Sequence, residues 1–291
     1  CVLAGVLLTE GALRPGRRPV VRRAEAAALM AREFGAVLEE AETQAPDGVQ
    51  LRGWFARPAN SNGSAVVLLH GVADNREGMG GYALLFLRHG YSVLLPDARA
   101  HGESGGDLTT YGVQEGADLA RWVMWLRQQR NAACVYGFGE SMGAALVLQS
   151  LREKAQFCSV AAESAFSSFR EIAYDRLGQR FGAGDWLGRT LFRPIVEVGM
   201  LYARWGYDVD LERASPQVAV ATTSVPVLLI HGAEDDNIPL RHSEVIHAGN
   251  PGGTALWVVS GTGHGGAVNA TPREFEERLL KWFDRTGTRT Q

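Results

Sequence analysis

Residues 132–143 read AACVYGFGESMG, an apolar run followed by the pattern G-x-S-x-G, and residues 144–151 continue as AALVLQSL. The first part has the composition of a short buried strand, and the last part reads as a helix packed on one face. A serine in a tight turn between such a strand and such a helix is typical of a nucleophile elbow. Gly139 and Gly143 supply the two positions without a Cβ that so tight a turn requires. The pattern predicts that Ser141 is a nucleophile at a helix N-terminus, where free N–H groups favour negative charge.

A candidate acid and a candidate base follow Ser141 along the chain. Residues 225–232 read as a strand, and the loop behind it holds Asp235; residues 255–259 read as the next strand, and the loop behind it holds His264. Because the carboxyl ends of neighbouring parallel strands meet at one edge of a sheet, we expect the three side chains to lie close together. A serine nucleophile needs a base to take its proton and an acid to orient that base. The sequence therefore predicts a triad of Ser141, His264 and Asp235.

Taken together, these features resemble the α/β-hydrolase superfamily over about residues 50–283, in its serine esterase or serine-aminopeptidase-like branch. The stretches that carry the resemblance are residues 69–71, 97–104, 139–143, 231–235 and 263–264. In that family the acid occupies the position matched here by Asp235. Asp236 is the adjacent alternative, and Glu163 is a second alternative because some members place the acid one strand earlier.

The resemblance also implies an oxyanion hole made of two backbone donors. One is the N–H of Met142, directly after the nucleophile. The other is the N–H of Val72, the residue that follows His70-Gly71, with Ala73 as the alternative. Two such donors would stabilise the negative oxygen that forms during attack on a carbonyl group.

The order of the remaining segments predicts an α/β fold. Strands are expected at residues 39–43, 49–57, 65–69, 91–96 and 157–162, with helices at residues 24–34, 84–89 and 113–129. Strands alternating with helices favour a mostly parallel central sheet with helices on both faces. We expect residues 39–285 to form one α/β-hydrolase domain.

About sixty residues rich in aromatic side chains separate the strand at 157–162 from the strand at 225–232. Several glycines, Gly178, Gly182, Gly184 and Gly188, are predicted to divide this segment into short helices. By the resemblance, about residues 165–215 form a small helical lid over the active site.

Residues 1–38 form an N-terminal segment of a different character. Residues 2–8 are apolar, several arginines follow, and residues 24–34 are strong helix formers. The apolar stretch is too short to span a bilayer. It reads either as the remnant of a signal or membrane anchor that begins before Cys1, or as an apolar tail docked on the domain. A lipid on Cys1 is disfavoured because no polar linker follows it. The first interpretation implies membrane association or export, and the second is compatible with the cytoplasm.

The composition limits the classes of function. A chain of 291 residues with 46% hydrophobic residues can bury a substantial core, and a net charge of −3 with both signs interspersed does not favour nucleic acid as a partner. No glycine-rich loop matches a phosphate-binding pattern, and no histidine pair is spaced for a metal beside a suitable acid. We therefore predict neither a cofactor nor a metal.

The remaining histidines and cysteines receive structural interpretations. His70 and His231 end strands and are expected to bond loop backbone, while His101 is expected to order a loop beneath the site. Cys134 and Cys158 lie in apolar strand-like runs, which predicts buried thiols rather than a disulfide.

The predicted function is that of a serine hydrolase, carboxylesterase-like, which cleaves a small-molecule or lipid-like ester through an acyl-enzyme. Three enzymatic alternatives share the same triad: an aminopeptidase or prolyl-type serine peptidase, an acyl-protein thioesterase, and a carbon–carbon bond hydrolase. A non-catalytic interaction protein on the same scaffold is a fourth alternative, although such proteins usually lose a triad residue.

Overall fold

A computed structural model of the chain describes residues 1–182 and 184–287. Its centre is an eight-stranded sheet with the order β1-β2-β4-β3-β5-β6-β7-β8. The strands are β1 (Val37–Gln44), β2 (Gln50–Arg57), β3 (Ala65–Leu69), β4 (Ser92–Pro96), β5 (Val135–Glu140), β6 (Ser159–Glu163), β7 (Val227–Gly232) and β8 (Thr254–Val259). From β4 to β8 all neighbours are parallel, while β1 and β2 form an antiparallel edge. The predicted α/β fold with a mostly parallel sheet is confirmed.

The helices follow the strands in the order expected for such a sheet. They are α1 (Val2–Leu13), α2 (Arg23–Phe34), α3 (Gly80–Arg88), α4 (Glu115–Gln129), α5 (Met142–Ser150), α6 (Phe169–Arg180), α7 (Gly184–Arg189), α8 (Arg193–Tyr207), α9 (Pro216–Ala221), α10 (Arg241–Gly249), α11 (Ala267–Ala270) and α12 (Pro272–Gly287). Short 3-10 turns lie at Arg76–Met79, Leu151–Glu153 and Leu211–Arg213.

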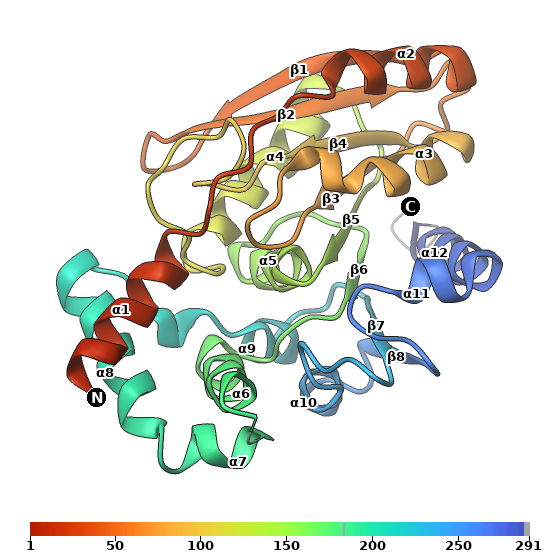
Figure 1. The fold of residues 1–291 in the computed structure, drawn as a ribbon. Coiled ribbons are helices and arrows are strands. Elements are labelled where there is room, and N and C mark those ends of the chain that lie inside the picture. Colours follow the sequence, from red (N-terminus) through yellow and green to blue (C-terminus); the bar gives the residue numbers. More distant parts are fainter. Residues whose placement is uncertain (183, 288–291) are drawn as a thin grey trace.

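Helices cover both faces of the sheet, as Figure 1 shows. Successive side chains of a strand point to opposite faces, so Val67 and Leu69 of β3 join one core while Val66 and Leu68 join the other. The first core is closed by α4, α5, α9 and α10, and the second by α2, α3, α11 and α12. Burial on both faces explains why β3 is a continuous apolar run rather than an alternating one.

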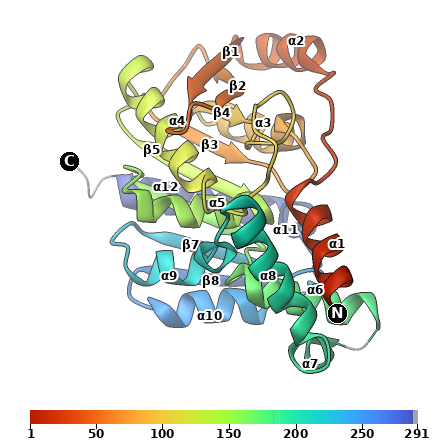
Figure 2. The same cartoon turned by 90° about the vertical axis from the view of Figure 1, so that its left-hand side faces the viewer.

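Three helices between β6 and β7, namely α6, α7 and α8, form an insertion outside the sheet. With α1 they lie together, away from the strands, in both views (Figures 1 and 2). Helices α6 and α8 share a small apolar core with Leu13 of α1. Gly178 lies inside α6 and does not end it, so the prediction that it breaks a helix was wrong.

The N-terminal helix α1 is docked along α8. The two helices approach closely because small residues face one another: a Cβ on Gly5 would lie 2.7 Å from the Ile195 carbonyl oxygen, and one on Gly199 would lie 2.3 Å from Thr9 Oγ1. Glu10 of α1 accepts a hydrogen bond of 2.6 Å from the Tyr202 hydroxyl of α8. Among the helices of the described ranges, none unites the length and the hydropathy needed to cross a bilayer.

Cys134 and Cys158 form a disulfide, so the prediction of two buried thiols was wrong. The two residues stand just before β5 and β6, which are parallel neighbours, and their Cα atoms are 5.9 Å apart. The apolar surroundings of each cysteine were correctly read. Their pairing depends on the neighbouring positions of two strands, which neither run of sequence contains.

Candidate active site

Ser141 stands at a strained turn between β5 and α5. Its backbone has φ 57° and ψ −119°, a conformation that residues with a side chain rarely adopt. The turn closes only around glycine: a Cβ on Gly139 would lie 2.4 Å from the Gly143 carbonyl carbon, and one on Gly143 would lie 2.2 Å from the Leu69 carbonyl oxygen. The strand, turn and helix expected around Ser141 are therefore present, and two glycines permit them.

His264 and Asp235 are joined by a hydrogen bond of 2.9 Å between Nδ1 and Oδ2. Asp235 is buried, and its other oxygen accepts from the backbone N–H groups of Asn237 at 3.0 Å and Ile238 at 2.8 Å. Burial opposes ionisation, but the hydrogen bonds from His264 and Ile238 outweigh it and hold the pKa of Asp235 below its usual value. An ionised carboxylate only accepts, so His264 Nδ1 carries the proton and Nε2 is the basic nitrogen.

The two alternatives for the acid lie elsewhere. Asp236 is exposed, and its backbone carbonyl accepts from Gln179 Nε2. Glu163 ends β6, where its Oε1 accepts from the Ala267 N–H at 2.9 Å and its Oε2 accepts from the Tyr82 hydroxyl at 3.2 Å. Burial raises the pKa of Glu163 to about 7. Of the three candidate acids, Asp235 is the one bonded to His264.

Ser141 and His264 come from loops at the same edge of the sheet, after β5 and β8. Gly265, next to His264, packs on Glu140, next to Ser141: a Cβ on Gly265 would lie 2.4 Å from Glu140 Oε1. Within the described ranges, no hydrogen bond links Ser141 Oγ to the His264 ring. Such bonds are often long in enzymes without substrate and tighten in the complex.

Val72 and Met142 line the same cavity as Ser141. Met142 is the first residue of α5, so its N–H has no partner within the helix. The Ala73 N–H donates to His101 Nε2 at 3.1 Å and is thereby occupied. Val72 is thus better placed than Ala73 to serve as a donor to a bound oxyanion.

The other histidines at this edge are buried and bonded to the loops. His70 Nδ1 bonds to the Gly71 carbonyl at 2.8 Å, and its Nε2 accepts from the Ala98 N–H at 3.1 Å. Burial lowers the pKa of His70 to about 4, so the ring is neutral and keeps Nε2 as an acceptor. His231 Nε2 bonds to the Ile238 carbonyl at 2.8 Å. These histidines hold the loops that carry Val72 and Asp235.

A cavity of about 610 Å³ opens at Ser141, within the range typical of small-molecule sites. It is largely apolar, and its walls come from α5, α6, α8 and, unexpectedly, α1. The α1 residues that line it are Gly5, Leu8, Thr9 and Ala12. Sequence reasoning missed them because nothing in residues 1–13 indicates contact with a segment nearly two hundred residues later. No group of three or more metal-binding side chains occurs in the part of the chain that the structure describes.

The sequence is similar to a known protein family and to bacterial proteins. Residues 66–278 match the family model described as "Alpha/beta hydrolase family". An uncharacterized Bacillus subtilis protein, YqkD, is 28% identical over 250 residues, which cover 84% of this chain and 78% of that protein. An uncharacterized Mycobacterium tuberculosis protein, Rv2307c, is 30% identical over 226 residues, 77% of this chain and 70% of that protein.

Solved structures with the same fold include enzymes. The Pyrococcus furiosus esterase Pf2001 superposes with a TM-score of 0.72 at 24% identity, covering 93% of this chain and 98% of the esterase. The Pyrococcus horikoshii acylaminoacyl peptidase superposes with a TM-score of 0.64 at 18% identity, covering 89% of this chain and 43% of the peptidase. These likenesses establish the fold, in which esterases and peptidases both occur.

Proposed function

Because the chain belongs to the alpha/beta hydrolase family, we propose that it is a serine hydrolase that cleaves carboxylic esters. The observation that carries the proposal is the strained backbone of Ser141 at the wall of an apolar cavity. Strain of this kind costs on the order of 1–3 kcal/mol and clusters at functional sites, where the surrounding fold maintains it. The bonded pair of His264 and Asp235 at the same sheet edge supplies the base that such a serine needs.

The reaction follows from the positions of these groups. Ser141 Oγ attacks the ester carbonyl while His264 Nε2 takes its proton, and Asp235 stabilises the imidazolium through Nδ1–H. The carbonyl oxygen becomes an oxyanion that accepts from the N–H groups of Val72 and Met142. The C–O bond to the alcohol then breaks, and Nε2 returns the proton to the leaving oxygen.

Hydrolysis of the acyl-enzyme repeats these steps with water as the nucleophile. Water attacks the acyl carbon while His264 Nε2 takes a proton from that water. The bond to Ser141 Oγ then breaks, Oγ regains the proton, and the carboxylic acid leaves.

The lining of the cavity favours an ester over the amino-terminal end of a peptide. An aminopeptidase needs a carboxylate to bind the substrate's cationic amine. Among the described residues that line the cavity there is no Asp or Glu, and two arginines, Arg176 and Arg180, are present. A cationic substrate end would therefore be repelled. Thioesters would fit the same groups and are a secondary candidate class.

Labelling with a fluorophosphonate tests the nucleophile. The wild-type protein should be labelled, Ser141→Ala should not, and Ser260→Ala, which removes an exposed serine outside the cavity, should be labelled normally. Labelling of a folded Ser141→Ala protein would refute the assignment.

Substrate panels test the reaction class. We expect turnover of 4-nitrophenyl esters that Ser141→Ala abolishes, and no comparable turnover of aminoacyl 4-nitroanilides. The reverse preference would identify a peptidase.

A further inference from the structure

Helix α6 presents one face to the cavity, and this face changes character along its length. Phe169, Ile172 and Ala173 line the cavity from the first half of the helix, and Arg176 and Arg180 line it from the second half. The spacing of three and four residues places all five on one side of the helix. The cavity wall therefore passes from apolar to cationic along a single element.

Two arginines bring positive charge to the cavity wall. Arg176 Nη1 donates to Asn237 Oδ1 and to Gln179 Oε1, which are neutral amide oxygens. Within the described ranges neither Arg176 nor Arg180 has a carboxylate partner. By contrast, Arg170 on the same helix pairs with Glu197 at 3.2 Å.

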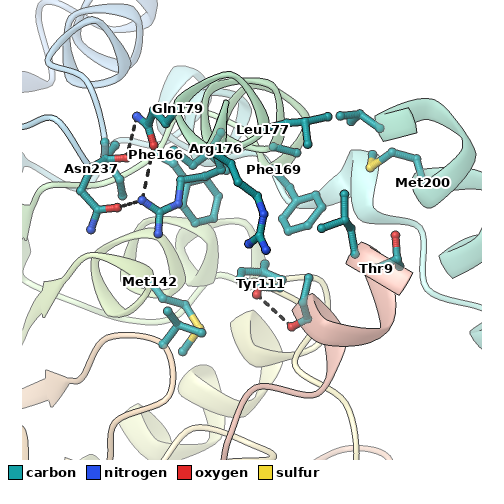
Figure 3. Close-up of a pocket in the computed structure, with 18 of the residues that line it drawn as sticks. Thr9, Tyr111, Met142, Phe166, Phe169, Arg176, Leu177, Gln179, Met200 and Asn237 are labelled. Atoms are coloured by element: carbon teal, nitrogen blue, oxygen red, sulfur yellow. Dashed lines mark hydrogen bonds between the residues drawn. The ribbon is translucent and has the colours of Figure 1, made fainter. Parts of the chain in front are cut away.

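Other parts of the cavity lining are apolar. Leu8 and Ala12 of α1, Val196 and Met200 of α8 and Leu177 of α6 all line it. Figure 3 shows Gln179 and Asn237 on one side of the cavity and Thr9 and Met200 on the other, with the hydrogen bonds of Arg176 drawn as dashed lines. Thr9 of α1 thus lies on the side of the cavity away from the amides that bond Arg176.

We propose, on the premise of the esterase activity above, that the substrate is an anionic amphiphilic ester. Its acyl chain occupies the apolar end between α1 and α8, and a carboxylate or phosphate in its alcohol part meets Arg176 and Arg180. Guanidinium groups match the geometry of both anions and donate to them in pairs. Burial of the chain supplies the larger share of binding, and the charge selects among chains of equal length.

A matched pair of probes tests the effect of charge. The probes are 4-octanoyloxybenzoate and its methyl ester, which share the acyl chain and release phenols that differ in the para group. Each kcat/KM is divided by the rate constant of the same probe with hydroxide, which removes the difference in leaving-group reactivity. We expect the wild-type kcat/KM to be about tenfold higher for the anion. The double variant Arg176→Gln/Arg180→Gln should lose that preference, because its kcat/KM should fall about tenfold more for the anion than for the methyl ester. The preference should also shrink at high salt, since screening weakens partly exposed pairs.

The control is Arg204→Gln, which removes one positive charge from α8. Arg204 is exposed and does not line the cavity. This variant should retain the anion preference. Equal rates for the two probes in the wild type would refute the proposal that Arg176 and Arg180 bind an anionic group of the substrate. A preference that survives in the double variant would refute it as well. Replacing the benzoate probe by 1-octanoylglycerol 3-phosphate, against 1-octanoylglycerol, distinguishes a phosphate from a carboxylate as the favoured anion.

A second variant tests the apolar end. Ala12→Leu adds bulk inside the cavity and should lower the ratio of octanoyl to acetyl ester turnover by at least fivefold. Gly11→Leu adds similar bulk on α1 where a Cβ meets nothing within 4 Å, so the ratio should not change. An unchanged ratio in Ala12→Leu would overturn the placement of the acyl chain.

Hydrolysis of 4-nitrophenyl acetate, a short neutral ester, tests the esterase activity separately from the preference for an anionic amphiphilic ester. If this reporter is hydrolysed in a Ser141-dependent manner while the probes show no charge or chain preference, the substrate class is wrong and the esterase stands. If the protein hydrolyses no ester in a Ser141-dependent manner, both the esterase activity and the substrate class are refuted.

Discussion

In the candidate site Asp235 is bonded to His264, and the sequence offered two other acids for its role, the adjacent Asp236 and Glu163 of β6. Asp235→Asn keeps the shape but offers an amide N–H where a carboxylate accepted, so the His264 ring is held in the wrong tautomer. We expect kcat for 4-nitrophenyl acetate to fall by about 1,000-fold or more. The same change one residue later, Asp236→Asn, should leave kcat unaltered because that side chain is exposed. A similar loss in both variants would contradict the assignment.

A proton-sharing group lies beneath the His264 loop. The Tyr82 hydroxyl is 3.2 Å from both Glu163 Oε2 and Glu140 Oε2, and burial raises the pKa of both carboxyls, that of Glu163 to about 7. The hydrogen bond from Tyr82 opposes this rise at Glu140, and the hydrogen bond from the Ala267 N–H opposes it at Glu163. In the unfolded chain Glu163 loses its proton near pH 4.3, so between about pH 4.3 and 7 the folded protein holds the extra proton.

Stability should therefore fall as the pH rises through that window and level off above it. Glu163→Gln removes the cost of ionising the buried group. We expect the difference in unfolding free energy, variant minus wild type, to increase by on the order of 2 kcal/mol from pH 5 to pH 8. Urea denaturation at several pH values measures this. A difference between the two proteins that does not vary with pH would show that Glu163 is not the group that titrates.

At the scale of elements, the contact of α1 with α8 depends on where its glycines lie. Gly5→Ala would bring a Cβ to 2.7 Å from the Ile195 carbonyl oxygen, whereas Gly11→Ala meets open space. Both changes favour the helix intrinsically, by up to about 1 kcal/mol. We expect Gly11→Ala to slow amide exchange in α1 and Gly5→Ala to accelerate it, because overpacking separates the helices. Equal effects would mean that α1 is not held on α8 through Gly5.

The disulfide between Cys134 and Cys158 ties together the starts of β5 and β6. It closes a loop across 24 positions of sequence, so replacing both cysteines by alanine should lower the unfolding free energy by about 2–4 kcal/mol. Without reductant, an alkylating reagent should modify the exposed Cys1 and spare the other two. Alkylation of Cys134 and Cys158 in the native, unreduced protein would contradict the bond.

At the scale of the whole molecule, the apolar clusters of the described residues differ in size. Two large cores lie on the faces of the sheet, and a smaller core lies among α1, α6 and α8. The smaller core has few members, and the helices that build it lie outside the sheet (Figure 1). Elements with fewer buried apolar contacts open at a lower free energy than the global unfolding.

Amide exchange should therefore show α1 and α8 opening together before β5, β6 and β7. Met200→Ala, in the smaller core, should lower the free energy of that opening by about 2 kcal/mol or more, while the amides of the sheet stay protected from exchange. Phe283→Ala, in a core of the sheet, should lower protection everywhere. If Met200→Ala also exposes the strands, the insertion and the sheet unfold as one unit.

The local features of the site were predictable because each depends on residues close together in the chain. The elbow around Ser141 is specified by Gly139, Gly143 and their flanks, and the order of strands and loops that ends at Asp235 and His264 follows from apolar runs read one at a time. The sheet was predictable for the same reason: alternating strands and helices of short range leave few arrangements that bury both faces.

The shape of the cavity was decided only by the tertiary structure. The wall that α1 contributes depends on which distant segments become neighbours, and so does the disulfide. The same holds for Arg176 and Arg180 of α6, which have no carboxylate partner among the described residues. The sequence by itself determined the fold and the candidate chemistry, since backbone geometry and hydrophobic periodicity act over a few residues. The choice of substrate was left to packing between segments far apart in the chain, because a pocket is the space that such segments leave between them.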